Sequence, residues 1–91
     1  MNVREATKIC FLRYLSEFNL PTELAILSQK AIDEIDSYPI DKLNRWLGFI
    51  QGYLIFNKLT TVDNERDFSR PLFHEAYKTE GIIIPPKFSV N

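Results

Sequence analysis

The residues that decide the fold are IDKLNRWLGFIQGYLIFNKL, positions 40–59 of a 91-residue chain. Apolar side chains recur here every three or four residues, which is the period of an amphipathic α-helix. The main stripe consists of Leu43, Trp46, Leu47, Ile50, Tyr53 and Leu54, and further apolar side chains around the cylinder are Phe49, Ile55, Phe56 and Leu59. A helix that is apolar on nearly every side is expected inside a core. We therefore predict a central, buried third helix over residues 40–59.

Two glycines in the same stretch, Gly48 and Gly52, are four residues apart and so share one face of that helix. A glycine inside a helix lowers its stability by up to about 1 kcal/mol relative to alanine. Close approach of a neighbouring backbone or ring usually compensates for this loss. The pair therefore predicts a packing groove for another helix rather than a ligand contact.

Prolines and capping residues divide the rest of the chain into helical segments. Pro21 and Pro39 suit first helical turns, where the missing N–H is not needed. Thr60, with Asp63 three residues later, resembles a capping box, and Gly81 is an expected helix end. The expected helices cover residues 2–18, 21–37, 40–59 and 62–79, and an extended tail covers 82–91. This pattern predicts an all-α, compact four-helix domain with a central apolar third helix and an extended C-terminal tail.

Length and composition exclude several classes of protein. Residues 1–91 suffice for a single domain, and one cysteine excludes an intrachain disulfide framework. Eleven Lys and Arg against twelve Asp and Glu give no global positive field for nucleic acid. The first residues lack the apolar core of a signal peptide, and no apolar run is long enough to span a bilayer. We expect a cytoplasmic protein with no membrane partner.

The residues that usually carry catalysis are sparse. His74 is the single histidine, and the position four residues on is Lys78, so the zinc-binding H-E-x-x-H pattern is incomplete. Cys10 lies on the apolar stripe of the first helix and is interpreted as a small core residue. The sequence therefore predicts a protein that is not an enzyme and that holds neither a metal nor a cofactor.

One basic constellation suggests an alternative. Arg66, Arg70, His74 and Lys78 form a stripe at four-residue spacing if the fourth helix continues through Pro71. Such a stripe suits phosphate, and Tyr77 or Trp46 would stack on a base, which describes a nucleotide or cyclic-nucleotide binding protein. Asp63, Asp67 and Glu75 are spaced to neutralise these cations by ion pairs. A small helical DNA-binding protein is a further alternative, although no helix is predominantly basic.

Candidate interface residues lie on the first two helices. Ile9 and Leu12 lie opposite the main stripe of the first helix, which gives that helix a second apolar face. Asp33 and Asp36 gather at the C-terminal end of the second helix, where the helix dipole disfavours acids. Together with twelve aromatic residues in a small domain, these features favour protein–protein contacts and a homo-oligomer.

Two blocks, KLNRWLGFIQG (42–52) and ERDFSRPLFHEAY (65–77), support a resemblance over residues 40–81. They resemble small accessory proteins of unassigned function from tailed bacteriophages and prophages of enteric bacteria. The resemblance implies expression in a bacterial host cytoplasm and action by binding a host or defence protein. The function predicted here is accordingly a non-catalytic protein–protein interaction module, for example a phage-encoded inhibitor of such a factor.

Overall fold

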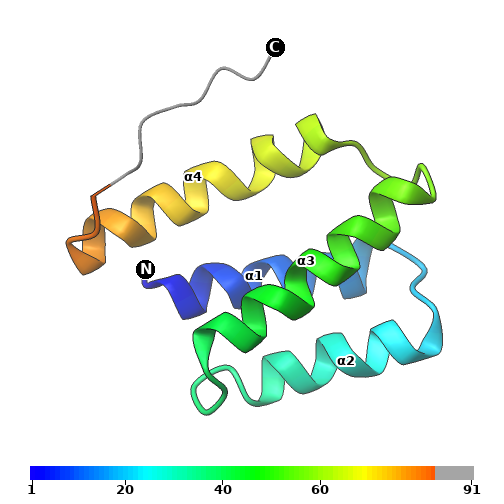
Figure 1. Cartoon of the computed structure of the whole chain (residues 1–91), viewed down its shortest axis with the longest axis horizontal. Coiled ribbons are helices and arrows are strands. Elements are labelled where there is room, and N and C mark those ends of the chain that lie inside the picture. Colours follow the sequence, from blue (N-terminus) through cyan, green and yellow to red (C-terminus); the bar gives the residue numbers. More distant parts are fainter. Residues whose placement is uncertain (84–91) are drawn as a thin grey trace.

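Helix α1 (Val3–Glu17) packs against all three other helices, which are α2 (Thr22–Asp33), α3 (Ile40–Phe56) and α4 (Val62–Glu80). In this computed structural model, which describes residues 1–83, α3 crosses over α1, with α2 and α4 on either side (Figure 1). The described residues form no strand. The predicted all-α, four-helix fold is therefore confirmed. Residues 84–91 of the predicted extended tail lie outside the described residues.

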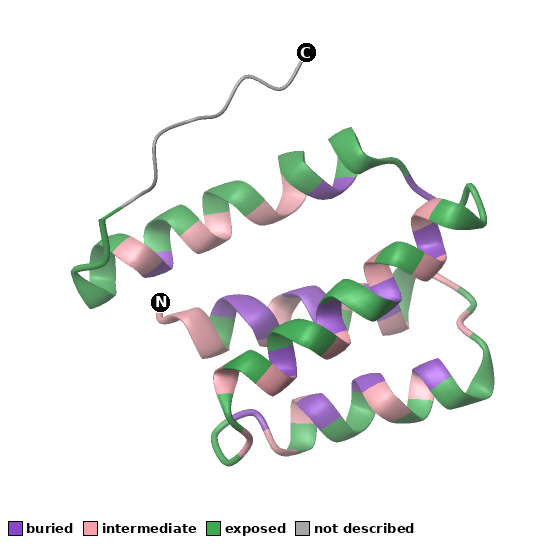
Figure 2. Ribbon diagram, viewed as in Figure 1, coloured by how far each residue is buried: buried purple, intermediate pink, exposed green. Residues whose placement is uncertain are grey.

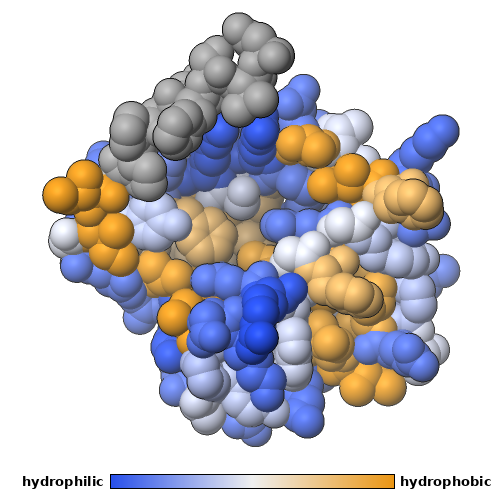
Figure 3. All heavy atoms as spheres, in the orientation of Figure 1, coloured by the Kyte–Doolittle hydropathy of each residue, from blue (hydrophilic) through white to orange (hydrophobic). Residues whose placement is uncertain are grey.

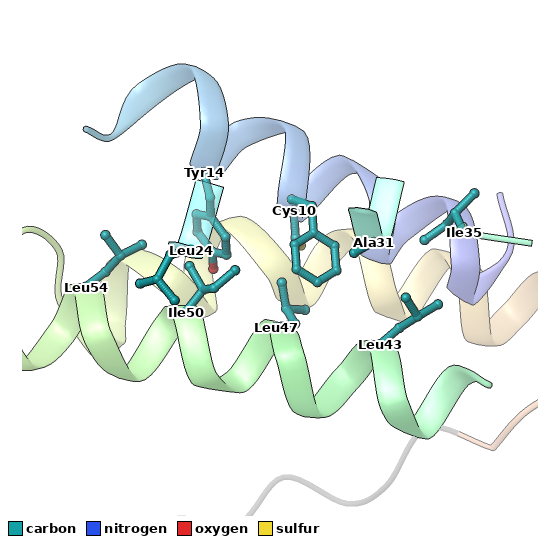
Figure 4. Packing of buried hydrophobic residues seen from close by; sticks show 10 residues of the cluster. Cys10, Tyr14, Leu24, Ala31, Ile35, Leu43, Leu47, Ile50 and Leu54 are labelled. Atoms are coloured by element: carbon teal, nitrogen blue, oxygen red, sulfur yellow. The ribbon is translucent and has the colours of Figure 1, made fainter. Parts of the chain in front are cut away.

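The core lies where α1, α2 and α3 meet (Figure 4). Cys10 and Tyr14 of α1 lie opposite Leu47 and Ile50 of α3 in this view. The complete set of buried core residues is Cys10, Phe11, Tyr14, Leu24, Ala31, Ile35, Leu43, Leu47, Ile50 and Leu54. The apolar third helix thus supplies four core residues at helical spacing, as its main stripe predicted.

The prediction that α3 is buried on nearly every side is wrong. Phe49 is 64% exposed and Phe56 is 86% exposed, and Leu59, beyond the end of the helix, is also exposed. Figure 2 shows an exposed strip along the side of α3 that faces away from α1. The four-helix arrangement covers one face of α3 only, because α4 packs on α1 instead of closing over α3.

Helix α2 ends at Asp33, four residues before the predicted end at 37. Tyr38 precedes Pro39, and a residue before proline is disfavoured in the α region, so the chain turns over residues 34–38 instead. The Arg4 guanidinium of α1 donates hydrogen bonds to the carbonyl oxygens of Ile35, at 2.8 Å, and Tyr38. Pro39 has no N–H to offer the Ile35 carbonyl, so Arg4 supplies a donor that continuation of the helix could not.

Helix α4 runs unbroken through Pro71 and ends at Glu80, one residue beyond the predicted end at 79, and Gly81 caps it as predicted. Gly81 has φ 71°, and the amides of Gly81 and Ile82 donate back to the last-turn carbonyls, which is a left-handed C-cap. The capping box predicted at Thr60 is wrong by one residue: the Oγ1 of Thr61 accepts from the Asn64 amide at 3.1 Å. The Thr60 hydroxyl instead donates to the Glu65 carboxylate at 2.8 Å.

Candidate functional site

A buried polar cluster joins the start of α4 to α1. The Glu65 carboxylate accepts two hydrogen bonds from Nη1 of Arg13, at 2.9 and 3.1 Å to its two oxygens. It also accepts from the Tyr14 hydroxyl and, at 2.8 Å, from the Thr60 hydroxyl. The Arg13 guanidinium lies 4.4 Å from the ring centroid of Phe68 and bonds to Glu17 through Nε at 2.9 Å. One carboxylate on α4 thus accepts from three residues, two on α1 and one in the connection between α3 and α4.

The cluster shifts the pKa values of its members. Burial opposes ionisation of Glu65, but hydrogen bonds from Arg13, Tyr14 and Thr60 outweigh it and lower the pKa of the carboxyl. Burial raises the pKa of the Tyr14 hydroxyl, and its hydrogen bond to Glu65 raises it further. Glu65 is therefore ionised, and Tyr14 is a neutral donor, at neutral pH.

Every buried side-chain nitrogen and oxygen in this cluster has a partner, which defines its role. Among residues 1–83, no buried side-chain nitrogen or oxygen lacks a hydrogen bond. A fully paired carboxylate has no lone pair aimed at a substrate, so the cluster holds α4 onto α1. Glu65 was not among the predicted site residues, although a signal existed: it lies three residues before Phe68, in register with the apolar stripe of α4.

Cys10 is fully buried beside this cluster, as its place on the apolar stripe predicted. Burial raises the pKa of its thiol to about 11, and the nearby Glu65 carboxylate acts in the same direction. A nucleophilic cysteine needs an accessible thiolate, which this environment disfavours.

The largest exposed aromatic side chains lie on the outward side of α3. Asp41, Arg45, Gly48, Gly52 and Phe56 recur every three or four residues and are all exposed. We call this set the outer stripe of α3, and it lies opposite the buried stripe that begins at Leu43. Phe49 flanks the outer stripe. In the space-filling view, apolar side chains gather over α2 and α3 on the right, beside a hydrophilic area (Figure 3).

A shallow hollow of about 390 Å³ borders the outer stripe, between α2 and α3; its lining residues are Leu27, Lys42, Arg45, Trp46 and Phe49. The Trp46 ring packs edge-on against Tyr38, with 5.6 Å between ring centroids. The Lys42 ammonium lies 4.1 Å from the centroid of Tyr38 and 5.1 Å from that of Trp46. Trp46 is therefore a half-buried, fixed wall of the hollow, with cations at its rim.

The basic stripe of α4 is continuous but stands apart from Trp46. Arg66, Arg70, His74 and Lys78 are all exposed on one unbroken helix. Tyr77 is half-buried beside the ring of Phe73, with 6.3 Å between centroids. No α4 residue lines the hollow at Trp46, so Trp46 and the stripe do not form one site there.

The acids expected to neutralise the α4 stripe do not pair with it. Within residues 1–83 the ion pairs closer than 4.0 Å are Arg13–Glu17 and Arg13–Glu65. Asp63, Asp67 and Glu75 are exposed on α4 and form no ion pair of this kind. Exposed ion pairs on a helix contribute little stability, because the weak attraction in water is nearly cancelled by the conformational entropy that the two side chains lose on pairing.

The four predicted interface residues lie in two places. Leu12 is 46% exposed on α1, and Ile9 on the same helix is half-buried. Asp33 is exposed at the end of α2 and accepts a hydrogen bond from Gln29 at 3.0 Å, whereas Asp36 lies in the turn beyond the helix. Their role at an interface stays a prediction.

No group of three or more His, Cys, Asp or Glu side chains in the described part of the chain is placed to hold a metal ion. No helix among residues 1–83 has the length and apolar character to cross a membrane. Comparison of the chain with protein-family models, curated proteins and solved structures finds no match.

Proposed function

We propose that this protein is a non-catalytic protein–protein interaction module and that its binding surface is the outer stripe of α3 with the adjoining hollow. The observation that carries the proposal is the exposure of Phe49 and Phe56 on a regular helix. Burying one such ring against a partner contributes about 1.5–3 kcal/mol to the free energy of binding. A ring that stays exposed adds no burial energy to the stability of the fold.

The composition of this surface supports the same proposal. Protein interfaces are enriched in aromatic residues and arginine, and binding energy concentrates where such anchors meet a pocket. Trp46, Phe49 and Arg45 line one hollow, and Trp46 is already held by Tyr38 and Lys42. A side chain that is fixed before binding loses little conformational freedom on binding. Action on a host or defence protein remains a proposal that follows from the phage resemblance.

The test is site-specific photo-cross-linking in the expressing cell. A photoreactive phenylalanine analogue replaces Phe49 or Phe56, so that an aromatic ring is kept at each position. In the matched control the same analogue replaces Glu75, which is exposed on α4. We expect protein adducts from positions 49 and 56 and none from 75. Adducts from position 75 alone, or equal yields from all three positions, contradict the proposed surface.

A second candidate is phosphate or nucleotide binding by α4. The observation that favours it is the continuity of the helix through Pro71, which keeps Arg66 and Arg70 on one exposed helix. Tyr77 is then the aromatic residue nearest in sequence for stacking, because Trp46 lies on another helix. Thermal-shift measurements with nucleotides, on the wild type and on Arg66→Ala and Arg70→Ala, test this candidate.

A further inference from the structure

The hollow between α2 and α3 combines a pair of cations with a pair of aromatic rings. Lys42 and Arg45 come first along α3, and Trp46 and Phe49 follow. Residues three or four apart on a helix are neighbours on its surface, so these side chains share one side of α3. Leu27 of α2 completes the lining. The hollow therefore offers positive charge and apolar surface next to each other.

The two cations have no acidic partner inside the chain. Among residues 1–83, no Asp or Glu lines the hollow. Neither Lys42 nor Arg45 forms an ion pair closer than 4.0 Å in this part of the chain, although Asp41 precedes them on the same helix. The whole chain has a net charge of −1, so the positive charge at the hollow is a local feature. Charge complementarity therefore selects a ligand with negative groups at this place.

Contacts with two aromatic rings fix the position of the Lys42 ammonium. The ammonium lies 4.1 Å from the ring centroid of Tyr38 and 5.1 Å from that of Trp46, and Lys42 is half-buried. Attraction to the rings holds the charge beside the hollow but does not neutralise it. A cation that is placed before binding loses little side-chain freedom when a carboxylate arrives.

The size and depth of the hollow favour a peptide over a free small molecule. Its volume is about 390 Å³, and a cavity of about 150 Å³ accommodates benzene, so one large apolar side chain fits. Sites for small molecules enclose most of the ligand and surround it with a few placed polar groups. This hollow is shallow, and no hydroxyl, amide or carboxyl side chain of residues 1–83 lines it. One side chain on a partner's backbone can fill it while neighbouring residues of the partner reach the cations.

We propose that the hollow binds an acidic segment of a partner protein by one apolar side chain and the carboxylates next to it. The inference rests on the proposed function and names the chemistry of the partner. The apolar side chain packs against Trp46 and Phe49. The carboxylates pair with Lys42 and with Arg45, whose guanidinium can bind one of them through two parallel hydrogen bonds. Lys42 and Phe49 are about 10 Å apart along the helix axis, which about three residues of an extended segment span.

Titration with synthetic peptides tests the proposal. The probe is a peptide with one phenylalanine flanked by aspartate and glutamate, and a matched peptide has asparagine and glutamine in their place. Trp46 is the single tryptophan, so its fluorescence reports binding at the hollow. We expect saturable binding of the acidic peptide and about tenfold weaker binding of the amide peptide. A third peptide, with glycine in place of phenylalanine, should bind at least about tenfold more weakly than the acidic peptide.

Removal of single charges from the protein gives a second, independent measurement. Lys42→Gln and Arg45→Gln should each weaken binding of the acidic peptide about threefold and leave the affinity for the amide peptide unchanged. Arg45→Gln keeps the contacts of Lys42 with Tyr38, so its effect does not arise from altered aromatic packing. Lys58→Gln is the matched control, because it removes one charge at an exposed residue outside the lining. Circular dichroism checks that each variant is folded.

Three results overturn the inference of an acidic partner. They are equal affinity for the acidic and amide peptides, an equal loss of affinity with Lys58→Gln, and no saturable change in Trp46 fluorescence up to about 1 mM peptide. A mononucleotide that binds at Trp46 more tightly than the acidic peptide also overturns it. Cross-linked protein adducts at positions 49 and 56 would still leave the proposed function standing in each case. Absence of such adducts refutes the proposed function whatever the peptides show.

Discussion

Replacing Gly48 and Gly52 of α3 by alanine should stabilise the isolated chain. Both residues lie inside the helix, and a Cβ at either position meets no atom within 4 Å. Alanine is therefore expected to contribute its full helix propensity without strain, about 1 kcal/mol at each position and about 2 kcal/mol together. For a domain of this size that corresponds to a rise in Tm of about 10 °C.

The third glycine of the chain provides a matched control with the opposite sign. Gly81 also has open space around its Cβ position, but its φ of 71° is in the left-handed region. Gly81→Ala is therefore expected to lower the free energy of unfolding by about 1 kcal/mol. All three glycines have open space at the Cβ position, and only Gly81 has a positive φ. Opposite signs of the change in stability would therefore show the effect of backbone conformation.

Urea unfolding followed by circular dichroism measures these changes in the free energy of unfolding. A loss of stability in the monomer would show that a neighbouring element packs on these glycines and would refute the reasoning.

Three further predictions concern the other sites. The Glu65 pKa is lower in the folded chain than in the unfolded chain, so the folded state binds fewer protons and its stability falls as the pH drops below about 5. Glu65→Gln should lower the free energy of unfolding by about 2 kcal/mol at pH 7. Urea titrations should show that this difference from wild type shrinks toward pH 3, where Glu65 of the wild type is protonated. A difference that stays constant with pH contradicts the role assigned to Glu65. Cys10 should react with a thiol reagent only as fast as the chain unfolds, since burial raises the pKa of its thiol to about 11. Mass spectrometry with and without urea measures the labelling rate, and fast labelling of the native chain contradicts this prediction. If α4 binds nucleotides, a ligand at about a hundredfold excess over Kd should add about 2.7 kcal/mol of stability, and the thermal shift should disappear in Arg66→Ala and Arg70→Ala; a shift that survives both substitutions excludes the stripe.

The number and order of the helices follow from local patterns. Apolar periodicity locates each helix, Asn2 accepts from the Glu5 amide as an N-cap at 2.8 Å, and Gly81 ends α4 because glycine tolerates positive φ. Helix ends are less predictable, because they depend on partners from elsewhere. The chain turns after Asp33 where Arg4, more than thirty residues earlier in the sequence, binds the free carbonyl groups.

The candidate binding surface could be predicted only in part. Periodicity shows that α3 carries apolar residues around much of its circumference, but it does not tell which face another helix will cover. That choice depends on how α1 packs, and it leaves Phe49 and Phe56 in solvent. The buried cluster was missed for a similar reason. Glu65 and Arg13 are 52 residues apart, and charged residues are usually solvated unless a specific partner is present.

The separation of Arg13 and Glu65 also determines an order of events during translation. At roughly 5–20 residues per second, the ribosome adds the 52 residues between them in about 3–10 s. During that interval the guanidinium on α1 has no carboxylate to receive it from α4. Docking of α4 is therefore expected to be the last step, and pulse-labelling hydrogen exchange should show its amides protected after those of α1 and α3. A chain that stops before residue 65 lacks this carboxylate and leaves the side of α1 that α4 covers open to other proteins.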